Sequence, residues 1–237
     1  MLILIMNMFS KVINHLNHKF LLFLLFAYVA GYGQLKEEKK GYYLEDQIYF
    51  KFSYNVLDRL PKDASQSGFS NSFSIGFIRD LPVNEQRNFG FGAGLGYGYQ
   101  TYFHNLKIYE ENGQTIFNYF EEDYKTNRLK INQLEFPLEI RWRTSTIEKY
   151  KFWRIYSGIK FNYIFLSKSV FEINKKQVYK NLNAINKLQY GITVAAGYGN
   201  WNFFMYYGLT PLFKNATIEN EKITTKELKF GLQFYIL

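Results

Sequence analysis

Two glutamates four residues apart, Glu135 and Glu139, are of a type and spacing that could support chemistry. A pair of carboxylates can divide the roles of acid and base, as in glycoside hydrolysis. Both lie in segment 134–142, LEFPLEIRW, where apolar and polar residues alternate. Side chains alternate across a strand, so both glutamates share one polar face with Arg141. A cation beside two acids favours ion pairs over a catalytic pair.

Charged residues recur on the same kind of face in other segments of the chain. An unpaired charge in a buried position is costly, so charges that share an interior should neutralise one another. We therefore predict a luminal ion-pair network formed by Lys51, Glu135, Glu139, Arg141, Arg154, Lys160, Glu227 and Lys229.

His104 is the one histidine outside the N-terminal region that contains His15 and His18. Catalysis by a histidine needs a carboxylate or serine close to it. A single histidine beside a polar loop is usually solvated, so we predict no catalytic residue and no enzyme activity. The acidic run 121–123 offers oxygen ligands for a cation but lacks calcium-loop spacing, so we predict no metal and no cofactor. The acids near His104 in sequence are Glu110, Glu111, Glu121, Glu122 and Asp123.

Residues 89–99, FGFGAGLGYGY, superficially suggest a phosphate-binding loop. The spacing G-x-G-x-x-G is absent, because glycine occupies every even position from 90 to 98. A period of two indicates a strand with one bare face. Such a face leaves room for large interior side chains, and a slot for a small ligand is the alternative. The expected occupants are Arg141, Arg154, Tyr156 and Lys160.

Eight strand-like segments hold these residues, each with an apolar and a polar face. In the first, Ile48, Phe50 and Phe52 oppose Tyr49 and Lys51. Pro137 interrupts the fourth, where we expect a bulge or kink at Phe136–Pro137. The segments are Gln47–Leu57, Gly68–Asp80, Phe89–Phe103, Leu129–Arg143, Phe152–Leu166, Ile185–Gly199, Trp201–Phe213 and Thr225–Leu237.

The pattern predicts an all-β fold, an eight-stranded antiparallel up-and-down transmembrane β-barrel with lipid outside and a polar, side-chain-filled interior. A mean hydropathy of −0.26 argues against membrane helices, which need about 20 consecutive apolar residues. The alternative is a soluble, lipocalin-like barrel with apolar residues inside. The face that carries the aromatic residues at the strand ends discriminates between the transmembrane and the soluble barrel.

Connection lengths and tryptophans give the orientation. The longer connections, 58–67, 104–128, 167–184 and 214–224, alternate with the shorter ones, 81–88, 144–151 and 200. Outer-membrane barrels have short periplasmic turns and long external loops. In this topology Trp142, Trp153, Tyr198 and Trp201 form a girdle at the periplasmic rim, since indole rings favour the membrane interface.

The N-terminal region reads as an export signal. A cationic stretch precedes the apolar run Phe20–Ala30, and small residues follow it, which predicts cleavage near Gly33–Gln34. An uncleaved anchor is the alternative. We predict a signal peptide at 1–33, a periplasmic lead-in at 34–45 and a barrel at 46–237, placed in the outer membrane of a Gram-negative bacterium.

Charge and cysteine content exclude other classes of protein. The net charge of +9 falls to 27 − 20 = +7 without residues 1–33, which hold two lysines and no acid. The cations are scattered rather than gathered in a stripe, which argues against nucleic-acid binding. Without cysteine, no disulfide can stabilise the exported fold. The expected partners are outer-membrane lipid and envelope or secretion-machinery proteins, and we expect a monomeric barrel.

Four segments carry a resemblance to a known family: GYGQ at 31–34, GFIRDLPVN at 76–84, LEFPLEIRWR at 134–143 and the terminal FGLQFYIL. Together they resemble the PorT-like (porin-like) outer-membrane β-barrel family over approximately residues 46–237. The resemblance implies the fold and the location, and it suggests an accessory role in type IX-like secretion across the outer membrane. It supplies no catalytic motif.

We therefore expect a structural or surface-interaction protein that presents loops 104–128 and 167–184 outward. A secretion accessory is the second hypothesis. A small-ligand channel and an outer-membrane enzyme are further alternatives.

Overall fold

The computed structural model describes residues 46–84, 86, 88–144 and 153–236. The predicted signal peptide and most of the lead-in lie outside this range, as do Phe152 and Leu237. The described strands all belong to one compact unit, Tyr43–Leu237. No helix in the described part has the length and hydropathy of a membrane span.

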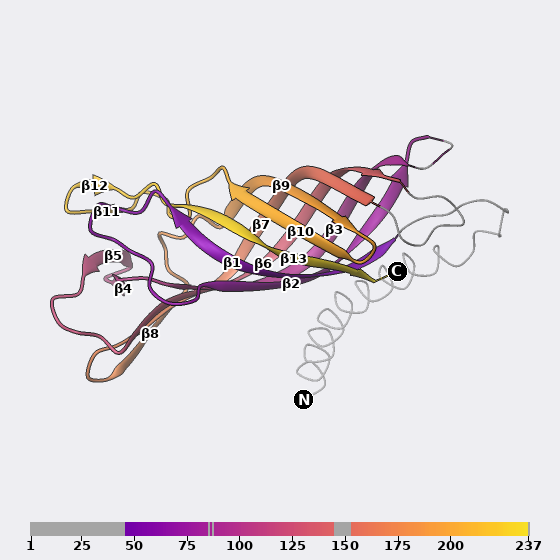
Figure 1. Ribbon diagram of the computed structural model, residues 1–237. Helices are drawn as coiled ribbons and strands as arrows, with labels where there is room; N and C mark the ends of the chain where they lie inside the picture. The colour runs from indigo at the N-terminus through magenta and orange to yellow at the C-terminus, as the bar shows by residue number, and fades with distance from the viewer. Residues whose placement is uncertain (1–45, 85, 87, 145–152, 237) are drawn as a thin grey trace, which may run out of the picture. The chain divides into compact units, whose positions relative to one another are not determined.

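Thirteen strands follow one another along the described residues, eight in the wall of a barrel and five in its external connections (Figure 1). They are β1 (Gln47–Asp58), β2 (Asn71–Pro82), β3 (Phe89–Phe103), β4 (Leu106–Glu111), β5 (Gln114–Tyr119), β6 (Thr126–Arg143), β7 (Trp153–Glu172), β8 (Lys176–Lys180), β9 (Leu188–Tyr198), β10 (Trp201–Gly208), β11 (Thr217–Ile218), β12 (Glu221–Lys222) and β13 (Lys226–Ile236).

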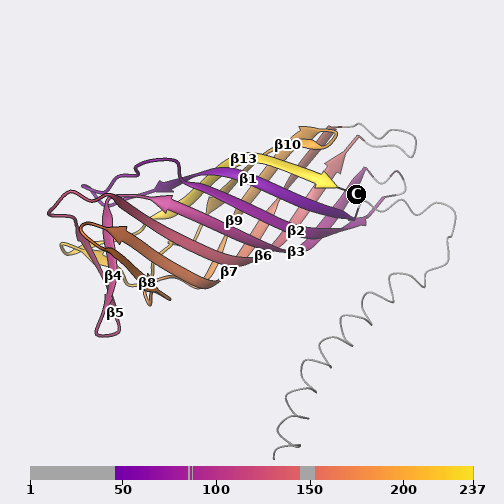
Figure 2. The same cartoon turned by 90° about the horizontal axis from the view of Figure 1, so that it is seen from below.

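The wall closes on itself. Its strands pair antiparallel in the order β6-β3-β2-β1-β13-β10-β9-β7, and β6 also pairs with β7 (Figure 2). Closure removes the free edges at which an open sheet would pair with another chain. The predicted eight-stranded antiparallel barrel is confirmed, with the eight predicted segments as its eight wall strands.

The outward face of the wall is apolar on every strand. Phe52, Leu138, Trp201 and Phe203 expose between 52% and 64% of their surface, and similar residues surround the barrel. A soluble monomer rarely exposes a continuous apolar patch of more than a few hundred Å². The apolar residues face outward and the charges inward, so the lipocalin-like alternative is wrong.

The wall changes chemistry along its length, as β6 shows. From Leu134 to Trp142 its outward residues are apolar, whereas Arg128, Lys130 and Asn132 face outward nearer its start. Its inward residues are apolar near its start, where Leu129 and Ile131 are fully buried, and charged farther along. The outer boundary of the lipid therefore lies between Asn132 and Leu134, and the barrel continues beyond it.

The long connections are all at one end of the barrel and the short ones at the other, as predicted. Residues 59–70, 104–125, 173–187 and 209–225 form the external end. The strands that the short connections join, β2 to β3, β6 to β7 and β9 to β10, meet at the periplasmic end, and residues 85, 87 and 145–152 of these connections lie outside the described range. Strands β4, β5, β8, β11 and β12 gather at the external end in Figure 1. The β4–β5 hairpin turns at Asn112–Gly113, both with positive φ, which is the preferred chemistry of a two-residue turn.

Two predicted strands, β9 and β10, are clearly shorter in the structure, and two, β6 and β7, are clearly longer. The predicted strands began at Ile185 and ended at Phe213, but these two residues lie in the external connections 173–187 and 209–225. They form only an isolated bridge with each other, beyond the ends of β9 and β10. Strand β7 instead continues to Glu172, because β6 stays paired with it as far as Thr126. Residues that the alternation assigned to β9 and β10 belong to the external connections.

The glycine stripe of β3 faces inward and is filled by neighbouring side chains. A Cβ at Gly96 would overlap the Tyr49 hydroxyl oxygen, and one at Gly92 would lie 2.8 Å from Cδ of Arg141. Arg141 was an expected occupant, but Arg154, Tyr156 and Lys160 are not among the nearest atoms. Tyr49, Ile78 and Glu135 take their place, because β1, β2 and β6 are nearer to β3 than β7 is.

The bulge expected at Pro137 is not there. The register of β6 with both neighbours is the same on either side of this residue, and only two pairs with β3 are missing, at Phe136 and Pro137. The Pro137 ring packs against Gly94, where no side chain competes for the space. The register shift between β6 and β7 lies instead between Asn132 and Gln133. Asn132 pairs with Leu166 and Gln133 with Ile164, so one residue of β7 is skipped.

Candidate functional site

The lumen holds the eight charged residues that the sequence singled out. All eight are inward-facing and expose 5% or less of their surface. Six of them belong to three groups along the barrel axis. The second and third groups are joined, because the Gln100 side-chain amide donates to the Gln133 side-chain oxygen at 3.2 Å.

The first group lies toward the periplasmic end and centres on Asp80 of β2. Asp80 Oδ1 is 2.9 Å from Arg141 Nη1, and its Oδ2 is 2.7 Å from Arg143 Nη2. Arg141 also lies 3.7 Å from the Glu139 carboxylate through Nε and donates to the Gln47 side chain. Its guanidinium stands 4.2 Å from the centre of the Tyr156 ring. The Asp80 carboxylate thus pairs with two arginines at a fully buried position.

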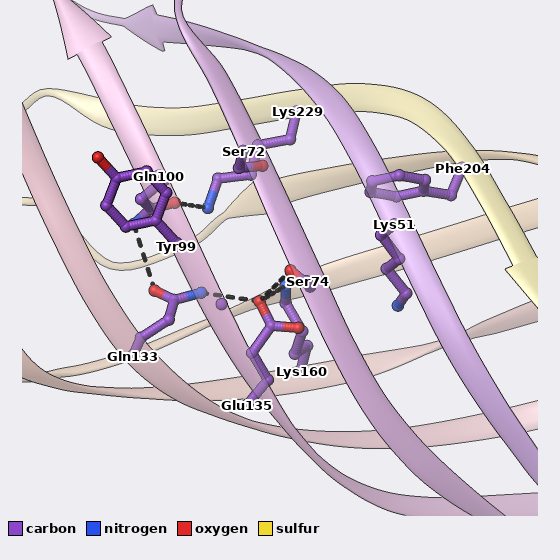
Figure 3. A pocket seen from close by; sticks show the side chains of 11 residues that line it. Lys51, Ser72, Ser74, Tyr99, Gln100, Gln133, Glu135, Lys160, Phe204 and Lys229 are labelled. Carbon is purple, nitrogen blue, oxygen red and sulfur yellow. Dashed lines mark hydrogen bonds and ion pairs between the residues drawn. The ribbon is translucent and has the colours of Figure 1, made fainter.

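The second group centres on Glu135 of β6, shown in Figure 3. Lys160 donates to its Oε1 at 2.9 Å, as does the Gln133 amide at 2.9 Å, and the Ser74 hydroxyl donates at 3.1 Å. The Tyr49 hydroxyl reaches Oε2 at 3.4 Å. The surrounding cavity measures about 10 Å³, room for one water molecule.

The third group lies toward the external end. Glu227 accepts hydrogen bonds from Tyr102 at 2.6 Å and from the Gln100 amide at 2.9 Å. Lys229 Nζ lies 3.1 Å from the same carboxylate and donates to the Gln100 side chain. Tyr102 reaches across from β3 to β13, so this group bridges the lumen.

Two of the predicted cations, Arg154 and Lys51, lie outside these three groups. Arg154 donates to the carbonyl of Gly199, in the β9–β10 turn, at 2.6 Å. Lys51 has no hydrogen bond or ion pair with a described residue, and its Nζ lies 4.5 Å from the Tyr49 ring centre. A cation over an aromatic face retains part of its electrostatic stabilisation.

Asp80 and Arg143 are the important luminal residues that sequence reasoning missed. The eight predicted residues comprise five cations and three carboxylates, an excess that pointed to a missing acid. Asp80 shares its face of β2 with Ser74 and Ile78, both inward, so alternation was the available signal.

The four predicted girdle residues lie at the periplasmic end and face outward. Trp142, Trp153, Tyr198 and Trp201 expose between 42% and 64% of their surface. Tyr198 pairs in register with both Trp153 and Trp201. Amphipathic rings side by side at the level of the short turns are suited to a membrane interface.

The external end of the lumen is closed by an apolar core that the sequence did not reveal. Inward residues of the wall, including Leu129 and Ile164, pack with residues of three external connections. Phe117 of β5 meets Phe213 edge to face, with ring centres 4.9 Å apart. Buried contributions from the connections include Ile108, Leu182, Ile185, Leu212, Ile218 and Ile223. We call this part of the molecule the external cap.

Hydrogen bonds join the connections of the external cap to one another. Asn183 donates to Glu110 through its backbone N–H at 2.8 Å and to the carbonyl of Gly113 through its amide at 2.9 Å. The backbone N–H of Lys214 donates to Ala184 at 2.7 Å. Asn105 ties the first connection to the second through the backbone of Ser65, at 2.7 and 3.1 Å. All four external connections are therefore linked.

His104 is buried beneath this cap rather than solvated as expected, with only 1% of its surface exposed. Its Nδ1 accepts a hydrogen bond from the Leu106 backbone N–H at 3.2 Å, so the proton of the neutral ring is on Nε2. Nε2 has no hydrogen-bond partner among the described residues. Burial lowers the pKa of His104 to about 4.

Lowering the pH should therefore destabilise the external cap through His104. The unfolded pKa is about 6.5, so the stabilisation is present above that pH and is lost as pH falls through about 4, in total about 3 kcal/mol. His104→Asn keeps an acceptor for Leu106 and does not titrate. We expect the free energy of urea unfolding to fall more between pH 7 and pH 4 for the wild type than for this variant. Equal falls would contradict the neutral, buried assignment.

The acidic run 121–123 is exposed and borders an open groove of about 670 Å³ that Asp63 and Tyr119 also line. Within the described ranges no three His, Cys, Asp or Glu side chains are arranged to hold a metal ion. Glu135 and Glu139 do not face a common cavity as a catalytic pair would, because each interacts with a different luminal group.

A closed barrel with a lipid-facing apolar surface and a charged interior defines an integral outer-membrane β-barrel protein. The family described as outer membrane protein beta-barrel domain matches residues 33–214, and the chain belongs to it. No curated protein sequence matches the chain.

Two solved structures of Ail, the attachment invasion locus protein of Yersinia pestis, are similar to the chain. The complex with the heparin analogue sucrose octasulfate shares 12% identity over 82% of this chain and 99% of that one, with a TM-score of 0.35. The second shares 9% identity over 80% and 96%, with a TM-score of 0.32. Likeness at this level does not extend to function.

Proposed function

We propose that this protein is a non-conducting outer-membrane barrel whose external cap is a surface for interaction. The observation that carries the proposal is that the lumen is filled by side chains of two kinds, charged and apolar. Ion-pair groups occupy it within the membrane, and the apolar core of the external cap covers its outer mouth. An eight-stranded barrel is just wide enough to be filled by its side chains. Linked connections give a partner a pre-organised surface, which lowers the entropic cost of binding.

The closed lumen predicts the absence of conductance. Purified full-length protein inserted into planar lipid bilayers should give no discrete ion-conducting steps. A well-characterised 16-stranded porin in the same bilayers provides the positive control. Reproducible steps from the purified barrel would contradict the closed lumen and favour a small-ligand channel.

The interaction role predicts that partners meet the external end. A photo-crosslinking residue at the exposed position 122, in the second external connection, should form adducts on intact cells. The same residue at the exposed position 200, in the β9–β10 turn, is the matched control at the opposite end. Adducts from position 200 alone would contradict a surface role.

The finer resemblance to the PorT-like family supports an alternative, an accessory role in protein secretion. Adducts at the periplasmic end would agree with it. The direct test is deletion of the gene, followed by comparison of proteins released into the medium with those retained in the periplasm. Retention that complementation reverses would favour the secretion role, and an unchanged pattern would oppose it.

We propose no catalytic activity. The burial of His104 and the engagement of Glu135 and Glu139 in separate polar groups support this. His104→Asn should leave lipid A modification and surface proteolysis by cells unchanged, and loss of either activity would overturn the proposal.

A further inference from the structure

A cationic groove runs along the outside of the barrel, just beyond the lipid-facing surface. It has a volume of about 320 Å³ and lies over β6, β7 and β8. Arg128, Lys130, Lys168 and Lys176 line it, and its lining contains no acidic residue. The ion pairs of the described residues do not include any of these four cations.

The strand register places like charges directly opposite one another. Lys130 of β6 pairs with Lys168 of β7, which in turn pairs with Lys180 of β8. Cross-strand partners project on the same side, with Cβ atoms about 5 Å apart, and like charges there are destabilising. We refer to these three residues as the lysine row. The repulsion would be relieved by an anion bound along the row.

Arg128 adds an unused donor beside the lysine row. It lies two residues before Lys130 on the same face of β6, and its Nε is buried without a hydrogen-bond partner. A guanidinium and neighbouring ammonium groups are the usual ligands of phosphate oxygens in proteins.

The height of the groove identifies the source of the anion. Lys130 is four residues from Leu134, the first lipid-facing residue of β6, a distance of about 13 Å along the strand. Between them Tyr97 packs near Phe165 and donates to Asn132 at 2.5 Å, as aromatic residues at an interface do. Lysine stems can lie along the wall and reach toward the membrane surface. The groove therefore faces lipid headgroups.

We propose that the lysine row and Arg128 bind the phosphate groups of an anionic lipid headgroup in the outer leaflet, namely a phosphorylated glycolipid of the lipid A class. Each basic residue near an anionic membrane surface strengthens the attraction roughly fivefold. Several cations in line match a headgroup with more than one phosphate. Binding here fixes the barrel to the outer leaflet and neutralises the row.

The test compares the triple variant K130Q/K168Q/K180Q with the wild type and with K62Q/K214Q/K222Q. The control removes the same charge from lysines that are exposed in other external connections. Purified proteins in neutral detergent are titrated with lipid A, with dephosphorylated lipid A and with inorganic phosphate, and bound lipid is measured by native mass spectrometry. Loss of the row should weaken lipid A binding on the order of a hundredfold. The control should bind as the wild type does.

Thermal unfolding in lipid-free detergent supplies a second measurement that does not depend on binding. Without lipid, the triple variant should be at least as stable as the wild type, because the repulsion between the lysines is gone. Added lipid A should raise the stability of the wild type and of the control more than that of the triple variant. Equal lipid A binding by the triple variant would overturn the proposal. Equal binding of dephosphorylated lipid A, or competition by inorganic phosphate at equal concentration, would also overturn it, because a headgroup phosphate within a lipid would not be recognised.

Discussion

Asp80→Asn should lower the free energy of unfolding by about 3–5 kcal/mol, as breaking a buried ion pair on one side typically does. The substitution preserves shape but removes the carboxylate charge that Arg141 and Arg143 share at 2.9 and 2.7 Å. Asp80 is fully buried, so water cannot replace its charge. Glu139 lies farther from Arg141, at 3.7 Å, and does not replace it.

The measurement is urea unfolding of the refolded barrel in detergent, followed by tryptophan fluorescence. Asp123→Asn, at an exposed position, is the matched control and should change stability by less than about 0.5 kcal/mol. Membrane insertion should be retained in both variants, because the outward apolar face is unaltered. If Asp80→Asn unfolded at the same urea concentration as the control, the ion-pair interpretation of the lumen would fail.

Glu135→Gln should have an effect of similar size, about 3–5 kcal/mol. It removes the one carboxylate that pairs with Lys160 among the residues that the structure describes, while Lys51 and Lys229 line the same small cavity. Three ammonium groups would then share an interior with one fewer negative charge. The amide can still accept from Ser74, so the loss should report charge rather than a missing hydrogen bond.

A double variant separates the cost of an unpaired charge from the value of the pair. Removing both members of a buried pair is often nearly neutral, whereas removing one is costly. Glu135→Gln with Lys160→Met should therefore recover much of the stability that Glu135→Gln loses. Glu122→Gln is the exposed control for the single change. A double variant less stable than the single one would show that Lys160 stabilises the barrel through other contacts.

The external cap explains why the lumen is sealed by two different kinds of packing. Within the lipid the outside of the wall must be apolar, which leaves the interior to polar groups that neutralise one another. Beyond the lipid the outside is in water, so the interior can again be apolar. Ile131 and Leu129 therefore face inward only two and four residues before Gln133, on the same side of β6.

The sequence by itself determined the number of wall strands, their inward and outward faces and the direction of the barrel. Alternation with period two is a local property, so residues such as Lys51, Arg141 and Phe52 were assigned to a face without knowledge of their neighbours in space. Connection length is likewise read directly from the chain, and it separated the external from the periplasmic end.

Only the tertiary structure decided which charges pair and what closes the outer mouth. Asp80 meets Arg141 across 61 residues of sequence, and Gln100 meets Glu227 across 127. Such pairings depend on strand order and register. These are properties of the folded barrel, and the local alternation of residues does not encode them. His104 shows the same dependence: a polar loop predicts exposure, but its burial arises because separate connections fold over it as the external cap.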